Sequence, residues 1–105
     1  MSAPPDSPKP YRVAYSERVR EELRNLLARA ADAGLLDEVV AAARQMDRAL
    51  RIYPQIGQPL RDLQLGPARL WIAVFAPLVV RYFLDEERRM VIVVVPIQPL
   101  PHLGL

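Results

Sequence analysis

The stretch "RLWIAVFAPLVVRYFLDEERRMVIVVV", residues 69–95, decides the fold. It contains three apolar runs, at 69–75, 78–84 and 90–95, that are rich in β-branched and aromatic residues, which favour strands. Only a pair of residues, Ala76–Pro77, and a charged turn at 85–89 separate them. Because connections this short join antiparallel neighbours, the stretch predicts the antiparallel centre of a sheet.

Upstream of this stretch, the apolar residues recur at helical spacing instead of alternating. The pattern predicts helices at 17–33 and 37–53, with Ser16 as the N-cap of the first and Asp37 as the N-cap of the second. Gly34 is placed to end the first helix. The short connection predicts an antiparallel helical hairpin.

Two further strands complete the expected fold. The segment "YRVAYS" predicts a first strand at 11–15, and a short strand is expected around 60–63. The fold class is therefore α+β: a two-helix hairpin on one face of a four- to five-stranded antiparallel sheet, built from 11–15 and 58–95. We expect one domain at 11–97, between a flexible Pro-rich leader at 1–10 and a Pro-rich tail at 98–105.

Composition narrows the classes of function. The 105 residues are 51% hydrophobic, carry a net charge of +2 and include no cysteine. His102 is the single histidine, so no metal site of several imidazoles is expected within one chain, and no cofactor. Thirteen of the fourteen cations are arginine, which is typical of a GC-rich bacterial genome, and the small net charge does not indicate nucleic-acid binding. With neither a signal peptide nor an apolar run of ~18 residues, a soluble cytoplasmic protein is expected.

The order of these elements resembles the RelE/ParE superfamily of bacterial type II toxins, which are paired with antitoxins in plasmid-stabilisation systems. "YRVAYSERVREEL" looks like the opening strand and helix of that family, and "GQPLRDL" resembles the segment after its second helix. Trp71 stands where an aromatic residue commonly opens the next strand, and "LVVRYFLDEERRMVIVVV" is similar to the closing hairpin. The resemblance covers residues 11 to about 97.

The chain departs from the RNA-cleaving members of this family where their basic residues gather. Phe75 stands near an expected strand arginine, and 78–80 reads Leu-Val-Val in place of the common Tyr-Arg-Val. Residues 97–99 read Ile-Gln-Pro instead of a glycine and a basic pair. We therefore expect weak RNase activity or none.

If the chain does cleave RNA, it is expected to be a metal-independent endoribonuclease. Such cleavage needs a base, an acid and a cation. The weak candidates for these roles are Arg61, Arg81 and His102, with Arg69 and Tyr82 as further polar groups. Arg81 and Tyr82 are adjacent on one strand and must face opposite sides of the sheet, and Tyr82 is expected in the core.

Three functions remain open from the sequence. The favoured one is a toxin-like component that inhibits growth mainly by binding protein, with DNA gyrase as the ParE-type target. The second is a ribosome-dependent mRNA endonuclease. The third is a non-toxic orphan scaffold that acts as an oligomer or as a partner-binding module.

The uncovered face of the sheet predicts an interface. Phe75, Val79, Arg81 and Phe83, or their opposite-face neighbours, are the expected partner-binding residues. The partner is expected to be a cognate antitoxin or a second copy of the chain, so the purified chain should not be a free monomer. Leu100, Leu103 and Leu105 in the tail are further candidates to cover the apolar face.

Overall fold

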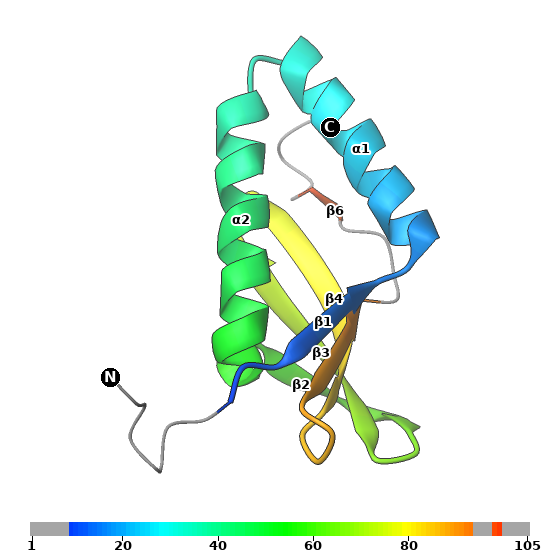
Figure 1. Ribbon diagram of the computed structural model, residues 1–105. Coiled ribbons are helices and arrows are strands. Elements are labelled where there is room, and N and C mark those ends of the chain that lie inside the picture. Colours follow the sequence, from blue (N-terminus) through cyan, green and yellow to red (C-terminus); the bar gives the residue numbers. More distant parts are fainter. Residues whose placement is uncertain (1–8, 94–97, 100–105) are drawn as a thin grey trace, which may run out of the picture.

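A computed structural model describes residues 9–93 and 98–99, with the backbone alone at 61–65 and 98–99 (Figure 1). The elements are, in chain order, β1 (Arg12–Tyr15), α1 (Glu17–Asp32), α2 (Leu36–Ile52), a 3₁₀ turn η1 (Pro54–Ile56), β2 (Gln58–Leu65), β3 (Ala68–Phe75), β4 (Leu78–Asp85), β5 (Met90–Val93) and β6 (Gln98–Pro99). Both predicted helices are confirmed to within one residue at each end.

The sheet has the order β1-β5-β4-β3-β2, and β6 pairs with the start of β4. The predicted antiparallel centre is confirmed, since β2, β3, β4 and β5 pair antiparallel in succession. The prediction of a wholly antiparallel sheet is wrong, because β1 pairs parallel to β5. Short loops fix the direction of neighbouring strands, but β1 reaches β5 from the far end of the chain, where no short loop constrains it.

Backbone hydrogen bonds hold β1 in this position. The Tyr11 N–H donates to the carbonyl of Arg51 at the end of α2, at 2.7 Å, and the Arg12 N–H donates to the carbonyl of Arg89, at 2.9 Å. The guanidinium of Arg89 also lies 5.0 Å from the centre of the Tyr11 ring, in cation–π range. The start of β1 is thereby attached to both the helical hairpin and the β4–β5 turn.

The ends of α1 follow the sequence signals. Ser16 Oγ accepts a hydrogen bond from the Val19 N–H at 3.1 Å, which confirms the predicted N-cap. Gly34 has a φ of 76°, and its N–H donates to the carbonyl of Ala31 while the Leu35 N–H donates to that of Ala30. This pair of bonds is a Schellman motif, which satisfies the last carbonyls of α1 and reverses the chain.

The predicted N-cap of α2 is wrong. The helix begins at Leu36, its capping residue is Leu35, and no side chain accepts a capping bond. Asp37 lies within the first turn beside Glu38, where both carboxylates face the positive end of the helix dipole. A Schellman motif is frequently accompanied by an apolar residue directly after the glycine, and here Leu35 takes that position and packs against the core.

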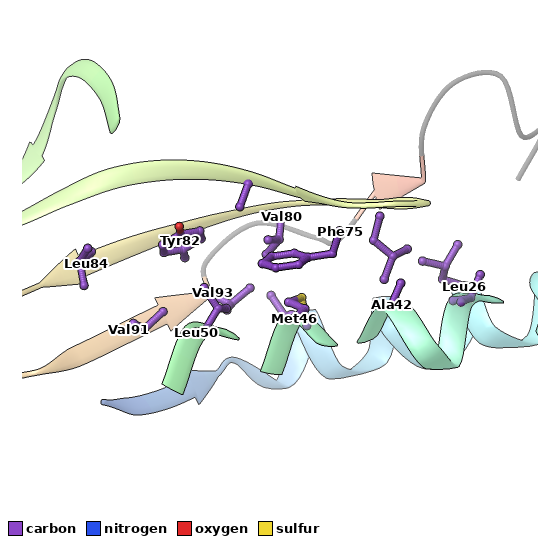
Figure 2. Close-up of a cluster of buried hydrophobic side chains, with 14 of the residues drawn as sticks. Leu26, Ala42, Met46, Leu50, Phe75, Val80, Tyr82, Leu84, Val91 and Val93 are labelled. Carbon is purple, nitrogen blue, oxygen red and sulfur yellow. The ribbon is translucent and has the colours of Figure 1, made fainter. Parts of the chain in front are cut away.

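The core lies between the helical hairpin and one face of the sheet (Figure 2). Leu26, Ala42, Met46 and Leu50 project from the helices toward the sheet. Alternate strand residues meet them from the other side: Phe75, Val80, Tyr82, Leu84, Val91 and Val93. Because side chains alternate along a strand, the residues between these positions point to the opposite face, which no helix covers.

Tyr82 ties this core to the corner that follows α2. It is fully buried, and its hydroxyl donates a hydrogen bond to the carbonyl of Pro54 at 2.6 Å. Gly57, at the end of η1, packs directly against Tyr82 and β3. The predicted core position of Tyr82 is confirmed.

Candidate functional site

The face of the sheet opposite the helices is the candidate site, and we call it the open face. Strand register places the following described side chains on it, from β1, β3, β4 and β5: Arg12, Ala14, Leu70, Ile72, Val74, Val79, Arg81, Phe83, Asp85, Met90 and Ile92. Eight of these eleven side chains are apolar, and the charged ones are Arg12, Arg81 and Asp85. The sheet thus carries a continuous apolar surface on the side that the helices leave free.

These side chains shield one another to different degrees. Leu70 is 9% exposed and Val74 is 59% exposed, while Val79, Arg81 and Phe83 are partly buried. Direct cross-strand pairs of large residues, such as Phe83 with Leu70 and Ile92, account for this shielding. The face is a half-buried layer, which is typical of a surface that gains from being covered.

Phe75 does not belong to the open face, so its grouping with Val79, Arg81 and Phe83 was wrong. It pairs with Leu78 across the turn, it is 3% exposed and it lies in the core. In a two-residue hairpin, an odd-numbered residue on one strand stands opposite an even-numbered residue on the other, and opposite residues share a face. Val74 is the residue that stands opposite Val79.

Arg81 is the cation at the centre of the open face. It stands opposite Ile72, and Arg12 lies at the β1 edge of the same face. Among the described residues, neither arginine makes an ion pair. The nearest acidic position on β4, Asp85, is 6% exposed and accepts a hydrogen bond from the Arg88 N–H of its own turn. The open face therefore carries two arginines against one described carboxylate, Asp85, which is buried and held by its own turn.

The predicted catalytic candidates do not form a cluster in the described part of the chain. Arg81 lies on the open face, and Tyr82 lies on the other side of the sheet, as expected. Burial raises the pKa of Tyr82 to about 12, so its phenol stays protonated near neutral pH. The side chain of Arg61 and the whole of His102 lie outside the described residues.

A hollow of about 300 Å³ lies on the helix side of the sheet. Trp71 and Leu84 contribute its apolar part, and Pro67, Arg69, Glu86 and Glu87 complete its lining. Glu86 also accepts a hydrogen bond from Gln55 at 3.2 Å. The sequence drew attention to Trp71 and Arg69 but gave no sign that the β4–β5 turn would approach them.

Sequence reasoning missed a polar network beside the helical hairpin. The Tyr15 hydroxyl donates to Asp47 Oδ1 at 2.8 Å, and Arg51 Nε donates to Asp47 Oδ2 at 2.8 Å. The hydrogen bond from Arg51 is the main cause that lowers the pKa of Asp47, and burial is the main cause that raises the pKa of Tyr15. The i,i+4 spacing of Asp47 and Arg51 is visible in the sequence, whereas Tyr15 is 32 residues away.

An apolar hollow of about 200 Å³ adjoins this network between α1 and α2. Val19, Leu23, Ala43 and Met46 line it, with Tyr15, Arg20 and Asp47 at the polar positions. The helices approach each other at their connection and diverge toward β1 (Figure 1). The hollow lies where the α1 start and the second half of α2 face each other beside Tyr15.

Within residues 9–60 and 66–93, where side chains are described, no three His, Asp or Glu side chains stand close enough to hold a metal ion. No helix in the described part of the chain has the length and apolarity that a bilayer crossing requires.

Comparison with protein-family models, with curated proteins and with solved structures finds no match to this chain.

Proposed function

We propose that this chain is a cytoplasmic, toxin-like component of a type II toxin–antitoxin system and that it acts mainly by binding protein. The observation that carries the proposal is the open face. It presents Val79, Phe83 and Ile92 around Arg81, which forms no ion pair among the described residues, on a sheet whose other side packs against the helical hairpin. An apolar layer with a central cation is suited to an antitoxin segment that brings both apolar side chains and a carboxylate.

The order of elements also supports the proposal. A first strand, a helical hairpin and a run of antiparallel strands follow one another, which is the order on which the resemblance to the RelE/ParE superfamily rests. Binding needs no catalytic group, so the separation of Arg81 from Tyr82 does not count against it. A ParE-type action on DNA gyrase is the form of toxicity that fits this reading.

The test begins with expression of the full chain in a bacterial host, alone and with the product of the adjacent gene. We expect the chain alone to arrest growth without new mRNA ends, and the product of the adjacent gene to relieve the arrest. If gyrase is the target, the chain should also abolish the supercoiling activity of gyrase. Codon-phased mRNA cuts that disappear in Arg61→Ala would overturn the proposal in favour of the endonuclease alternative. Normal growth and no complex with the neighbouring product would favour the orphan scaffold.

A pair of variants separates loss of binding from loss of folding. Val79→Glu places a charge on the open face, where Val79 is partly exposed. Val80→Glu places the same charge in the core, where Val80 is fully buried. We expect Val79→Glu to stay folded and to lose the partner, and Val80→Glu to unfold, because an unpaired charge in a core is not tolerated. A Val79→Glu protein that binds its partner like the parent chain would exclude the open face as the site.

A further inference from the structure

A second unpartnered surface lies away from the open face, on the outer side of α2 and the corner that follows it. Its apolar part is the corner: Ile52 is 63% exposed, Tyr53 is 59% exposed and Ile56 is 53% exposed. These are among the most exposed large apolar side chains of the described chain, and they fall within five consecutive residues. Single exposed apolar residues are ordinary, but three at one corner are not.

The corner is held rigidly. The Tyr53 N–H donates to the carbonyl of Ala49, and the Ile56 N–H donates to the carbonyl of Tyr53. Pro54 is buried and its carbonyl accepts the hydroxyl of Tyr82, while Gly57 is packed against β3. A rigid platform lets apolar side chains bind a partner without a large ordering cost.

The basic part of the surface is a stripe on α2. Arg44, Arg48 and Arg51 are all exposed and stand at i, i+4 and i+7, which places them on one side of the helix. Ile52, at i+8, continues this side toward the corner. The opposite side of the helix is buried against the sheet through Val39, Ala42, Met46 and Leu50.

Two of these arginines are free to meet a partner. Arg51 is held by Asp47, but among the described residues Arg44 and Arg48 form no ion pair. The helix dipole does not explain them, because its effect is confined to about the last turn and Arg44 lies two turns before the end of α2. Arg44 and Arg48 therefore supply positive charge beside an apolar corner, and no described side chain forms an ion pair with them.

We propose that the outer side of α2 and the corner at Ile52, Tyr53 and Ile56 bind an acidic peptide segment of a partner protein. Carboxylates of the segment pair with Arg44 and Arg48, and one or more of its large apolar side chains cover the corner. The charge on the surface selects an acidic segment, and the apolar corner requires that the segment also carry apolar residues. This inference is independent of the function of the open face.

Two other anionic partners fit the surface less well. A nucleic acid is held by many phosphate contacts, and here only Arg44 and Arg48 are unpaired, with Asp37 and Glu38 on the first turn of the same helix. A membrane-surface helix inserts the apolar side of the helix, but the apolar side of α2 is buried in the core. Three apolar residues at one corner suit the side chains of a peptide better.

The probe for the test is a labelled peptide of about 15 residues, long enough to form a helix, that alternates Glu with Leu and Phe at helical spacing. Its control has Gln in place of every Glu. We expect saturable binding of the acidic probe to the full chain, with amide NMR shifts at Arg44, Arg48 and the corner, and binding at least about tenfold weaker for the Gln probe. No binding of the acidic probe, or equal binding of both probes, would overturn the proposal.

Variants locate the site. We expect two variants to bind the acidic probe about tenfold or more weakly: the double variant Arg44→Glu, Arg48→Glu, and separately Ile52→Ser. Each variant removes one of the two parts of the surface. Arg29→Glu, which changes an exposed arginine on α1, should have no effect. Circular dichroism confirms that each variant is folded. Unchanged binding in the surface variants would overturn the assignment.

Further titrations test whether another partner binds this surface in place of an acidic peptide. Vesicles with anionic lipids and a duplex DNA are titrated against the parent chain and the Arg44→Glu, Arg48→Glu double variant. Binding of either one that is tighter than the acidic peptide and lost in the double variant would replace the proposed partner. Self-association that the double variant abolishes would instead identify a second copy of the chain as the occupant.

Discussion

At Gly57 the chain passes so close to β3 and β4 that a side chain has no room. A Cβ atom there would collide with the Ile72 carbonyl and lie 2.6 Å from the Tyr82 hydroxyl and 3.0 Å from the Ala73 Cβ. We expect Gly57→Ala to lower the free energy of unfolding by about 1–3 kcal/mol, since overpacking forces the neighbours to move. Urea unfolding followed by circular dichroism measures this loss.

The control for this prediction is Gly66→Ala. Gly66 has a φ of 58° but nothing within 4 Å of its added Cβ, so the cost there is the conformational one alone, about 1–2 kcal/mol. The two glycines thus separate steric from conformational requirements. If Gly57→Ala leaves the unfolding free energy unchanged, the close approach at this corner is not as tight as described.

A second prediction at the scale of single residues concerns the stability of the protein at low pH. The hydrogen bonds from Arg51 and Tyr15 lower the pKa of Asp47 below its ordinary value of 3.8, so the folded state favours the carboxylate. Its contribution is therefore complete above the unfolded pKa and is lost as the pH falls through the folded pKa. We expect Asp47→Asn to lose no more than about 1 kcal/mol near neutral pH, because the pair is exposed, and to lose correspondingly less relative to the parent chain near pH 2.

Urea unfolding at a series of pH values from 2 to 7 checks the Asp47 prediction. Tyr15→Phe removes one of the two hydrogen bonds and should remove part of the pH dependence. Equal losses of stability for Asp47→Asn at pH 2 and pH 7 would mean that the carboxylate charge contributes nothing.

At the scale of the elements, the connection between the helices depends on Gly34. Its φ of 76° lies in the left-handed region, which costs other residues energy. We expect Gly34→Ala to lower the unfolding free energy by about 1 kcal/mol, and Gly34→Asn to cost less, because Asn tolerates this region better. Thermal or urea unfolding of the three proteins gives the order. A Gly34→Ala protein as stable as the parent would contradict the Schellman motif.

Element boundaries were largely predictable because local signals agree with the tertiary structure. Ser16 and Gly34 mark the ends of α1, and Pro54 follows the end of α2. The direction of β1 was not predictable, because it is set by contacts with Arg51 and Arg89 that are remote in sequence. The missing cap at Asp37 has a local origin instead, since the preceding motif places Leu35 at the capping position.

The candidate site was predictable in part. Alternation along β4 correctly separates Val79, Arg81 and Phe83 from their neighbours, and it separates Arg81 from Tyr82. Phe75 was assigned to the wrong face because the parity of residue numbers changes across a two-residue hairpin. The network of Tyr15, Asp47 and Arg51 combines one local pair with a remote hydroxyl, and only the local pair has a sequence signal.

At the scale of the whole molecule, the sheet has two apolar faces, and the described part of the chain supplies one helical hairpin to cover them. The helices fill one face, so we expect a second chain to cover the open face in solution. Light scattering of the purified chain, with and without its partner, should therefore show a dimer or a complex. A stable monomer that gains no partner at working concentration would contradict it.

The charge of the open face distinguishes a second copy from an antitoxin. In a symmetric dimer across this face, Arg12 and Arg81 meet a surface with the same two arginines, and the one described β4 carboxylate, Asp85, is held by its own turn. Added salt screens like charges, so such a dimer should tighten between low and moderate ionic strength, whereas a complex with an acidic partner should weaken.

Sedimentation of the parent chain and of Arg81→Leu across a series of salt concentrations shows whether salt strengthens or weakens the association. For a dimer, Arg81→Leu should tighten association and flatten the salt dependence; for an acidic partner, it should weaken binding. A dimer that weakens with added salt and also weakens in Arg81→Leu would contradict the face-to-face arrangement. Repulsion between the arginines of that arrangement requires tighter association in both cases.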